Sequence, residues 1–406
     1  MRIAILSVAS VFVASTAMAD DWPQFLGPKR TGVSTETGLL QNWPADGPKE
    51  LWRVPCVGGL SGVAVVGNTA FTMVQEGTQQ VTAFDTRTGK RLWSSPVADA
   101  YRNQMGNGPR ATPTVVNGTV YAFTGDGTLV AIEAKSGQLS WKQTLVGDLG
   151  AKSAEYGMAS SPLVHGDLVI VAAGASGAAV VACETTTGNV RWKSGDDSAG
   201  YSSPIVANLG GALQIIAFTG GSVGGYAVET GKQIWSYRFV TDYECNIAVP
   251  LVIGDKVLIS AGENHGSVLL QPTRDGVKEA WKSFGKSSNL RAEWQTPVRI
   301  GQHLYGLDNQ GSAGPITNLN CVDAKTGKRV WQERRFGKSN LTLADGRLWL
   351  STMKGELVLV EPKPDGFKEL GRKRYLGMTR QAPTIAHGKL FLRDEKELVC
   401  FDIHAR

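Results

Sequence analysis

AFDTRTGKRLW (residues 83–93) recurs along the chain as AIEAKSGQLSW (131–141), ACETTTGNVRW (182–192) and CVDAKTGKRVW (321–331). Each copy reads small-x-acid-x-x-Ser/Thr-Gly-x-x-x-Trp, and AVETGKQIW (227–235) is a copy two residues shorter. The repeat tryptophans at positions 93, 141, 192, 235, 281 and 331 are spaced by 48, 51, 43, 46 and 50 residues. A period of about 40–50 residues indicates a β-propeller or a helical array.

The content of one period distinguishes these two folds. Residues 111–144 read as four short runs rich in β-branched residues, separated by the turn sequences NG, GDG and KSG. Such turns join antiparallel strands, so each period predicts one four-stranded propeller blade. The composition agrees, because 49 glycines and 19% charged residues suit short strands with tight turns. A hydrophobic share of 42% excludes disorder, and the absence of a three-residue glycine period excludes collagen.

Eight inner strands are expected, starting near Ser61, Ala111, Ser160, Ser202, Ala248, Thr296, Asn340 and Ala382. The eighth unit (381–406) ends after its third strand, and the segment PKELWRV (48–54) resembles a fourth strand. The N-terminal strand should therefore close the last blade and hide its edge. The prediction is an all-β, eight-bladed β-propeller over residues 48–406, with four antiparallel strands per blade.

The repeat residues have local structural roles. The acidic side chain is expected to cap backbone N–H groups of the turn, and the glycine to accept a positive φ. The large tryptophan ring on the outer strand should cover the seam to the neighbouring blade. This docking role is predicted for Trp52, Trp93, Trp141, Trp192, Trp235, Trp281 and Trp331. A second subtype, PTRDGVKEAW (272–281) and PKPDGFKELG (362–371), has Gly371 where tryptophan is expected.

The N-terminus predicts export. Residues 1–19 have a basic start, an apolar stretch and an Ala-x-Ala site, which are typical of a signal peptide cleaved after Ala19. Residues 20–47 then form a leader. We expect a periplasmic or secreted protein with no transmembrane segment, and no lipid-anchor cysteine, because the first cysteine is Cys56. The net charge of +6 is scattered, which does not indicate a nucleic-acid partner.

The repeat resembles the tryptophan-docking repeat of the PQQ-like (pyrroloquinoline-quinone) β-propeller superfamily. This superfamily includes quinoprotein alcohol dehydrogenases and the BamB-like outer-membrane assembly factors. The leader DDWPQFLGPKRTGVS (20–34) also resembles the start of the PQQ-like repeat proteins common in planctomycete-type bacteria. The resemblance implies the fold for almost the whole mature chain and leaves the function open, because one propeller fold hosts unrelated tasks.

The candidate binding residues lie on one face of the expected ring. The inter-blade loops that follow each tryptophan share this face with the loops between second and third strands, and function in such folds is carried by loops around the mouth. These loops hold Arg and aromatic residues that no turn requires. The candidates are Tyr101, Arg102, Arg110, Glu155, Tyr156, Asp242, Tyr243, Asn246, Arg291, Glu293 and Trp294.

Two main functions are compatible with this pattern. The first is a non-catalytic propeller of the cell envelope that binds a protein, peptide or glycan at the loop face. The alternative is a dehydrogenase that uses PQQ and Ca²⁺, for which Arg110, Glu155, Arg291 and Trp294 have suitable side chains. Against this alternative, the chain has neither the vicinal cysteine pair of the alcohol-oxidising members nor a CxxCH haem motif. No catalytic residues and no metal ligands are predicted.

Overall fold

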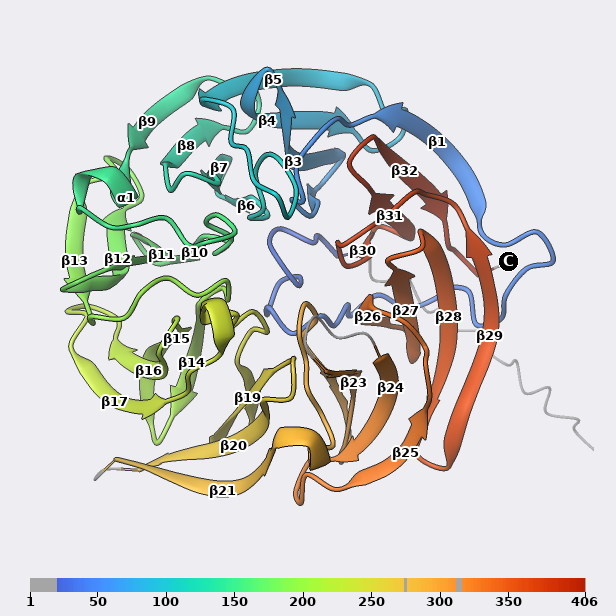
Figure 1. The fold of residues 1–406 in the computed structure, drawn as a ribbon. Helices are drawn as coiled ribbons and strands as arrows, with labels where there is room; N and C mark the ends of the chain where they lie inside the picture. Colours follow the sequence, from blue (N-terminus) through green and yellow to red (C-terminus); the bar gives the residue numbers. More distant parts are fainter. Residues whose placement is uncertain (1–19, 274–275, 312–315, 406) are drawn as a thin grey trace, which may run out of the picture.

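The computed structural model describes residues 20–273, 276–311 and 316–405, and the predicted signal peptide lies outside these ranges. Eight four-stranded antiparallel sheets are arranged as blades around a ring (Figure 1). The first strand of each repeat lies nearest the ring centre and the fourth lies at the periphery. The predicted eight-bladed propeller is therefore confirmed.

The first four blades follow the chain in order. Blade 1 consists of β2 (Ala64–Val66), β3 (Thr69–Glu76), β4 (Thr78–Asp85) and β5 (Arg91–Ala98). Blade 2 consists of β6 (Thr114–Val116), β7 (Thr119–Phe123), β8 (Leu129–Glu133) and β9 (Leu139–Gln143). Blade 3 consists of β10 (Leu163–His165), β11 (Leu168–Ala175), β12 (Ala178–Glu184) and β13 (Val190–Ser194). Blade 4 consists of β14 (Ile205–Leu209), β15 (Ala212–Phe218), β16 (Ser222–Ala227) and β17 (Gln233–Arg238).

The next three blades repeat this order. Blade 5 consists of β18 (Leu251–Ile253), β19 (Lys256–Ala261), β20 (Gly266–Thr273) and β21 (Gly276–Phe284). Blade 6 consists of β22 (Val298–Ile300), β23 (His303–Gln310), β24 (Ile316–Asp323) and β25 (Arg329–Glu333). Blade 7 consists of β26 (Ser339–Ala344), β27 (Arg347–Thr352), β28 (Glu356–Lys363) and β29 (Gly366–Arg374).

Blade 8 joins the two ends of the propeller. Its sheet order is β1-β32-β31-β30, from β1 (Lys49–Pro55), β32 (Glu397–Asp402), β31 (Lys389–Arg393) and β30 (Thr384–Ala386). Trp52 on β1 lies opposite Cys400 on β32 in an antiparallel register. The predicted closure by the N-terminal strand is confirmed, and it pairs the edge that β32 would otherwise leave open.

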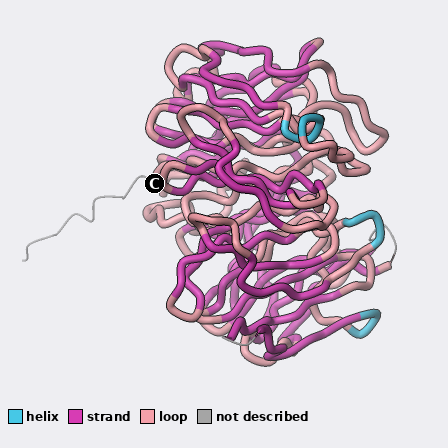
Figure 2. The backbone as a smooth tube through the Cα atoms, turned by 90° about the vertical axis from the view of Figure 1, so that its left-hand side faces the viewer, coloured by secondary structure: helices cyan, strands magenta, loops and turns pink. Residues whose placement is uncertain are grey.

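Within the described ranges, three short helical segments lie in the inter-blade loops. They are α1 (Leu145–Asp148) and the 3-10 turns η1 (Asp242–Glu244) and η2 (Gly285–Ser287). Figure 2 shows all three on the same face of the ring, which we call the loop face. The described part of the chain contains no helix of the length and apolarity needed to cross a membrane. All five cysteines are free thiols.

The repeat turn is held by its acidic residue. The Asp85 carboxylate accepts hydrogen bonds from the backbone N–H of Arg87 (2.9 Å) and of Thr88 (3.0 Å). The Arg87 guanidinium, together with these bonds, holds the pKa of Asp85 well below its usual range. Gly89 closes the turn with φ of 72°, a conformation that favours glycine. The side-chain cap expected from the sequence is therefore present.

The repeat tryptophan joins each blade to the next. Trp93 donates from its indole N–H to the backbone oxygen of Ala134, 3.0 Å away in blade 2. Its ring lies against Gly137, where an added Cβ would be only 2.7 Å from the ring. The same bond to the following blade is made by five others: Trp52 to Thr86, Trp141 to Thr185, Trp192 to Val228, Trp281 to Ala324 and Trp331 to Lys363.

Two seams depart from this pattern. The buried Trp235 donates to the side chain of Gln214 in its own blade, at 2.8 Å, while its ring packs in a core shared with blade 5. At blade 7, Gly371 leaves space on the outer strand, and Trp43 of the leader fills it. A Cβ at Gly371 would lie 1.9 Å from the Trp43 ring. The leader therefore supplies the aromatic group that the repeat lacks at this position.

The leader also fills the centre of the ring (Figure 1). Trp22 forms an antiparallel bridge with Val65 on β2, and Val33 forms a parallel bridge with Leu343 on β26. Near its other end, Glu36 accepts hydrogen bonds from the backbone of His387 and Gly388, in the β30–β31 turn on the face opposite the loop face. The leader therefore lines the channel and is part of the propeller core. Repeat analysis did not predict this position.

Arg30 anchors the leader to the inner strands. Its side chain is buried and donates hydrogen bonds to the backbone oxygens of Ser161 (3.0 Å), Pro204 (2.9 Å) and Pro162. These carbonyls precede the inner strands of blades 3 and 4. Burial lowers the pKa of the Arg30 guanidinium to about 9, so it remains charged at neutral pH. One leader side chain thus satisfies three backbone acceptors inside the channel.

Replacing a docking tryptophan should destabilise the ring. We expect Trp192→Ala to lower the free energy of unfolding by about 3–5 kcal/mol, because a large ring packed between two blades is removed. Val190, two residues away on the same strand, is 44% exposed, so Val190→Ala is the matched control. The control should change stability by less than about 0.5 kcal/mol. Equal denaturant midpoints for the two variants would contradict the docking role.

Removing the Arg30 anchor should release the leader. We expect Arg30→Met to cost about 2–4 kcal/mol, because three buried carbonyl groups lose the Arg30 donor and only that of Pro162 keeps another, the Thr114 hydroxyl. The neighbouring exposed Lys29 provides the control variant Lys29→Met. Limited proteolysis should cut the leader of the Arg30 variant faster than that of the control. Unchanged melting and unchanged cleavage of Arg30→Met would show that the leader does not depend on this anchor.

Candidate functional site

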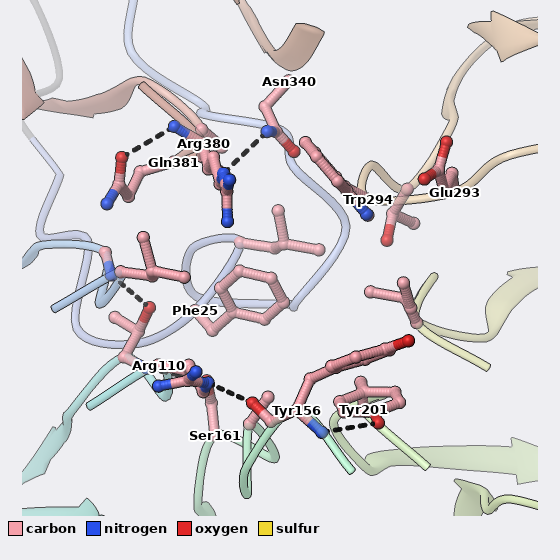
Figure 3. Close-up of a pocket in the computed structure, with 18 of the residues that line it drawn as sticks. Phe25, Arg110, Tyr156, Ser161, Tyr201, Glu293, Trp294, Asn340, Arg380 and Gln381 are labelled. Carbon is pink, nitrogen blue, oxygen red and sulfur yellow. Dashed lines mark hydrogen bonds between the residues drawn. The ribbon is translucent and has the colours of Figure 1, made fainter. Parts of the chain in front are cut away.

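A cavity of about 470 Å³ lies among the inter-blade loops at the mouth of the channel (Figure 3). The leader residues Trp22, Phe25 and Leu26 contribute to its lining and form its floor. Because the leader occupies the channel below them, the cavity is a blind pocket at the loop face. Figure 3 shows Phe25 in the middle of the lining residues.

One residue from each blade forms a ring around this pocket. In most blades a proline stands at the start of the inner strand, and the ring residue lies three positions before it. Examples are the arginines that open RATP (110–113) and RQAP (380–383). All eight residues at this position line the cavity: Leu60, Arg110, Ala159, Tyr201, Ile247, Trp294, Lys338 and Arg380. We call these eight residues the mouth ring.

A second set of residues, two positions further along, connects adjacent blades. Thr112 Oγ1 accepts a hydrogen bond from the Gly62 N–H (3.1 Å), and the Thr112 N–H donates to Ser161 Oγ (2.9 Å). The Ser161 N–H donates in turn to Ser203 Oγ (2.9 Å). Side chains alternate along an extended strand, so the mouth ring and this linking set face the channel together. The linking bonds hold the mouth ring in a fixed geometry.

Aromatic side chains form one wall of the pocket. Tyr156 and Tyr201 stack with ring centroids 6.0 Å apart, and the Tyr156 N–H donates to the Tyr201 hydroxyl oxygen (3.1 Å). Burial raises the pKa of Tyr201 above its usual range, so the phenol is neutral at physiological pH. Tyr243 stands at the rim and is 64% exposed, with a positive φ of 55°. This wall offers apolar contact area, and the Glu263 carboxylate near Tyr156 also lines the pocket.

Arg110 is held rigidly beside this wall. Its guanidinium donates to the backbone oxygens of Tyr156, Gly108 and Gly106, the last at 2.7 Å. It also lies 4.8 Å from the centre of the Tyr101 ring. Burial lowers the pKa of Arg110, and the neighbouring positive charge of Arg380 lowers it further.

Two cations flank Trp294. Lys338 Nζ lies 4.3 Å and Arg380 Cζ lies 5.3 Å from the centre of a Trp294 ring. Lys338 also forms an ion pair with Glu293 (2.8 Å). Burial raises the pKa of the Glu293 carboxyl, while Lys338 acts in the opposite direction. The arrangement neutralises Lys338 and leaves the face of Trp294 covered by cations.

The sequence-predicted candidates divide into two groups. The structure brings together five of them around the pocket, and these are Arg110, Tyr156, Tyr243, Glu293 and Trp294. Tyr101 lies behind Arg110, with its ring against Gly125 and Gly157. Arg102, Glu155 and Asp242 are exposed and do not line the pocket.

Arg291 and Asn246 lie in the protein interior, away from the pocket lining. The Arg291 guanidinium pairs with the Asp308 carboxylate through two bonds of 2.6 and 2.7 Å. The Asn246 amide donates to the backbone oxygens of Thr219 (2.7 Å) and Phe239 (3.1 Å). These contacts join loops to strands, which is a structural use of residues that sequence analysis placed among the binding candidates.

Sequence analysis missed Lys338, Arg380 and the leader residues of the floor. The signal for Arg380 is in the repeat, because RQAPT (380–384) aligns with RATPT (110–114). Lys338 has the same register in blade 7, where Leu341 replaces the proline. No repeat signal places Phe25, because the leader lies outside the repeats.

The side chains that line the pocket do not fit a calcium-dependent quinone cofactor. Within the residues that the structure describes, no three His, Cys, Asp or Glu side chains gather as metal ligands. Glu293, the acidic residue beside Trp294, already pairs with Lys338. Calcium requires several oxygen ligands, usually including carboxylates. The pocket lining therefore has cations and aromatic rings suited to an organic anion. Its two carboxylates, Glu263 and Glu293, are fewer than the three-residue acidic cluster that a metal site of this kind would need.

The fold recurs in solved structures. BamB from Moraxella catarrhalis has 12% sequence identity and a TM-score of 0.62, covering 88% of this chain and 100% of that chain. A quinohemoprotein alcohol dehydrogenase from Comamonas testosteroni has 13% identity and a TM-score of 0.68, covering 97% of this chain and 82% of that chain. At these identities the likeness shows the shared propeller fold alone.

Sequence comparison identifies the family. BamB from Burkholderia pseudomallei is 26% identical over 270 residues, which cover 63% of this chain and 62% of that protein. The chain thus matches somewhat less than two thirds of that relative's length. Residues 25–101 and 77–333 match the family described as outer membrane protein assembly factor BamB. Because this match spans more than half of the sequence, the chain belongs to the BamB family of PQQ-like β-propellers.

Proposed function

We propose that the protein is a non-catalytic binding module of the cell envelope that holds a protein partner on its loop face. The observation that carries this proposal is the blind pocket, to which every blade contributes one mouth-ring residue. A rigid, pre-formed pocket lowers the ordering cost of binding. Membership of the BamB family supports a protein partner, since that family is described as assembly factors of the outer membrane.

The rim of the pocket supports contact with a macromolecule. Three large apolar side chains are exposed at this rim. Met105 (37% exposed) and Tyr243 (64%) line the pocket, and Met378 (49%) contacts the lining residue Arg380. Exposed apolar groups beside a concave site are typical of protein interaction surfaces. Arg380 connects two of them, because it donates to the Met105 backbone oxygen (2.5 Å) and contacts the Met378 sulfur (4.0 Å). We infer that the partner covers the rim and inserts one side chain or chain end into the pocket.

We propose an exported protein with three parts. Residues 1–19 act as a cleaved signal peptide, residues 20–47 form the leader that plugs the channel, and residues 48–406 form the propeller. The family supports this location, because a factor for outer-membrane assembly acts in the envelope. Envelope export also agrees with the sequence-based expectation for the N-terminus.

Site-specific photo-crosslinking tests which face binds. A photoreactive residue at Met378, on the loop face, should capture a partner in intact cells. The matched control is Lys135, an exposed residue in the β8–β9 turn on the opposite face. We expect adducts from position 378 and none from position 135, because only the loop face has the pocket and its apolar rim. Adducts formed only at position 135 would contradict the proposal.

The cofactor alternative has a separate test. The purified mature protein is incubated with PQQ and Ca²⁺, dialysed, and examined by absorption spectroscopy. We expect the dialysed protein to be colourless and to show no calcium-dependent chromophore, because the described residues gather no cluster of three or more His, Cys, Asp or Glu side chains to hold the metal. A stoichiometric chromophore that is lost with a calcium chelator would instead establish a quinoprotein.

A further inference from the structure

The mouth ring is chemically divided into two arcs. Blades 3 to 6 contribute Ala159, Tyr201, Ile247 and Trp294, which we call the aromatic arc. Blades 7, 8 and 2 contribute Lys338, Arg380 and Arg110, which we call the basic arc, and the apolar Leu60 of blade 1 lies between the two arginines. Figure 3 shows the same division, with Arg110 and Arg380 toward one side of Phe25 and Trp294, Tyr156 and Tyr201 toward the other. The basic residues therefore adjoin the aromatic residues around one small cavity. Lys338 and Arg380 lie against Trp294, and Arg110 donates to the Tyr156 backbone oxygen.

The positive charge of the basic arc is concentrated on two arginines. Lys338 is paired with Glu293 at 2.8 Å. Arg110 donates to backbone oxygens, and Arg380 donates to the Met105 backbone oxygen, so the bonds of both go to uncharged partners. By contrast, Arg291 in the protein interior has its own carboxylate. The two pocket arginines therefore have hydrogen bonds that position them and no ion pair within the described residues.

The wall around Arg380 has unused donors. Arg380 Nε and Gln381 Nε2 are buried and have no hydrogen-bond acceptor among the described residues. The orientation of the Gln381 amide is determined by its neighbours, because its oxygen accepts from the Arg380 N–H (3.0 Å) and the Thr379 hydroxyl (2.9 Å). Buried polar groups normally have partners. An acceptor-rich group at this wall would meet that requirement after a small rotation of the side chains.

We propose that the pocket is a subsite for an apolar group that carries a carboxylate, with the acid at Arg110 and Arg380 and the apolar part against Phe25 and the aromatic arc. This inference rests on the proposed binding function and names its ligand chemistry. Guanidinium groups bind carboxylates through charge-assisted hydrogen bonds, and aromatic walls accept an aliphatic or aromatic body. The carboxylate could belong to the end of a partner chain or to a free organic acid.

Calorimetry with matched probes tests the charge requirement. The purified mature protein is titrated with 3-phenylpropionate and with the uncharged isostere 3-phenylpropionamide, and likewise with a short peptide ending in phenylalanine as the free acid or the amide. A small ligand of this kind is expected to bind with Kd of about 1 mM. We expect each acid to bind at least about tenfold more tightly than its amide, because a charge-assisted hydrogen bond is lost in the amide.

Variants locate the effect at the pocket. Arg380→Gln should weaken acid binding about tenfold and leave amide binding unchanged, while Arg380→Lys should retain part of the preference for the acid. The control is Arg299→Gln, because Arg299 is an exposed arginine on β22. This substitution should change neither acid binding nor amide binding. Unchanged thermal melting of each variant shows that folding is intact. A peptide acid that binds more tightly than phenylpropionate assigns the site to a chain end, and the reverse order assigns it to a free acid.

Two results would overturn the inference. One is equal binding of acid and amide, or no binding of either acid at several times the expected Kd. The other is acid binding that Arg380→Gln does not weaken. If either occurs while position 378 still captures a partner, the carboxylate subsite is wrong and the binding function stands. Loss of capture at position 378 together with intact acid preference would instead remove the proposed protein partner.

Discussion

The hydrogen bond from a tryptophan indole N–H to a backbone oxygen of the next blade is the contact on which the ring depends. At five of the six seams with this bond, a glycine in the receiving turn leaves room for the ring, as Gly137 does for Trp93. One residue pair thus supplies a directional bond and a large apolar contact at each seam where it occurs. Where the repeat lacks its tryptophan, at Gly371, the leader provides Trp43 instead. The seams therefore tolerate variation as long as an aromatic ring fills them.

Closing the ring creates the pocket. Once eight blades are held side by side, the starts of their inner strands converge, and each blade places one residue on the mouth ring. Hydroxyl groups such as Thr112 and Ser161 link adjacent inner strands just below it. The leader then occupies the channel, anchored by Arg30, and makes Phe25 a floor. The result is a rigid site whose chemistry can change by substitution at eight positions without affecting the seams.

This separation explains how one fold supports different activities. Solved structures with this propeller include an assembly factor and an alcohol dehydrogenase. The seam residues are requirements of the architecture, whereas the mouth-ring residues are the ones that we propose determine what this chain binds. In this chain the ring combines arginines with aromatic residues, and one oxygen of the nearby acid Glu293 pairs with Lys338. Those side chains favour binding of an anionic apolar group over coordination of a metal-dependent cofactor.

The sequence by itself determined the propeller, the eight blades, the closure by residues 48–54 and the loop face, because each of these follows from local turns and strand order. The structure places two of the sequence-predicted candidates, Arg110 and Trp294, in the lining of the pocket on that face. Only the tertiary structure decided that Arg291 pairs with a buried aspartate, that Arg380 joins Arg110 at one pocket, and that the leader fills the channel. These contacts join residues far apart in the chain, and their positions depend on ring closure, which no local pattern of residues encodes.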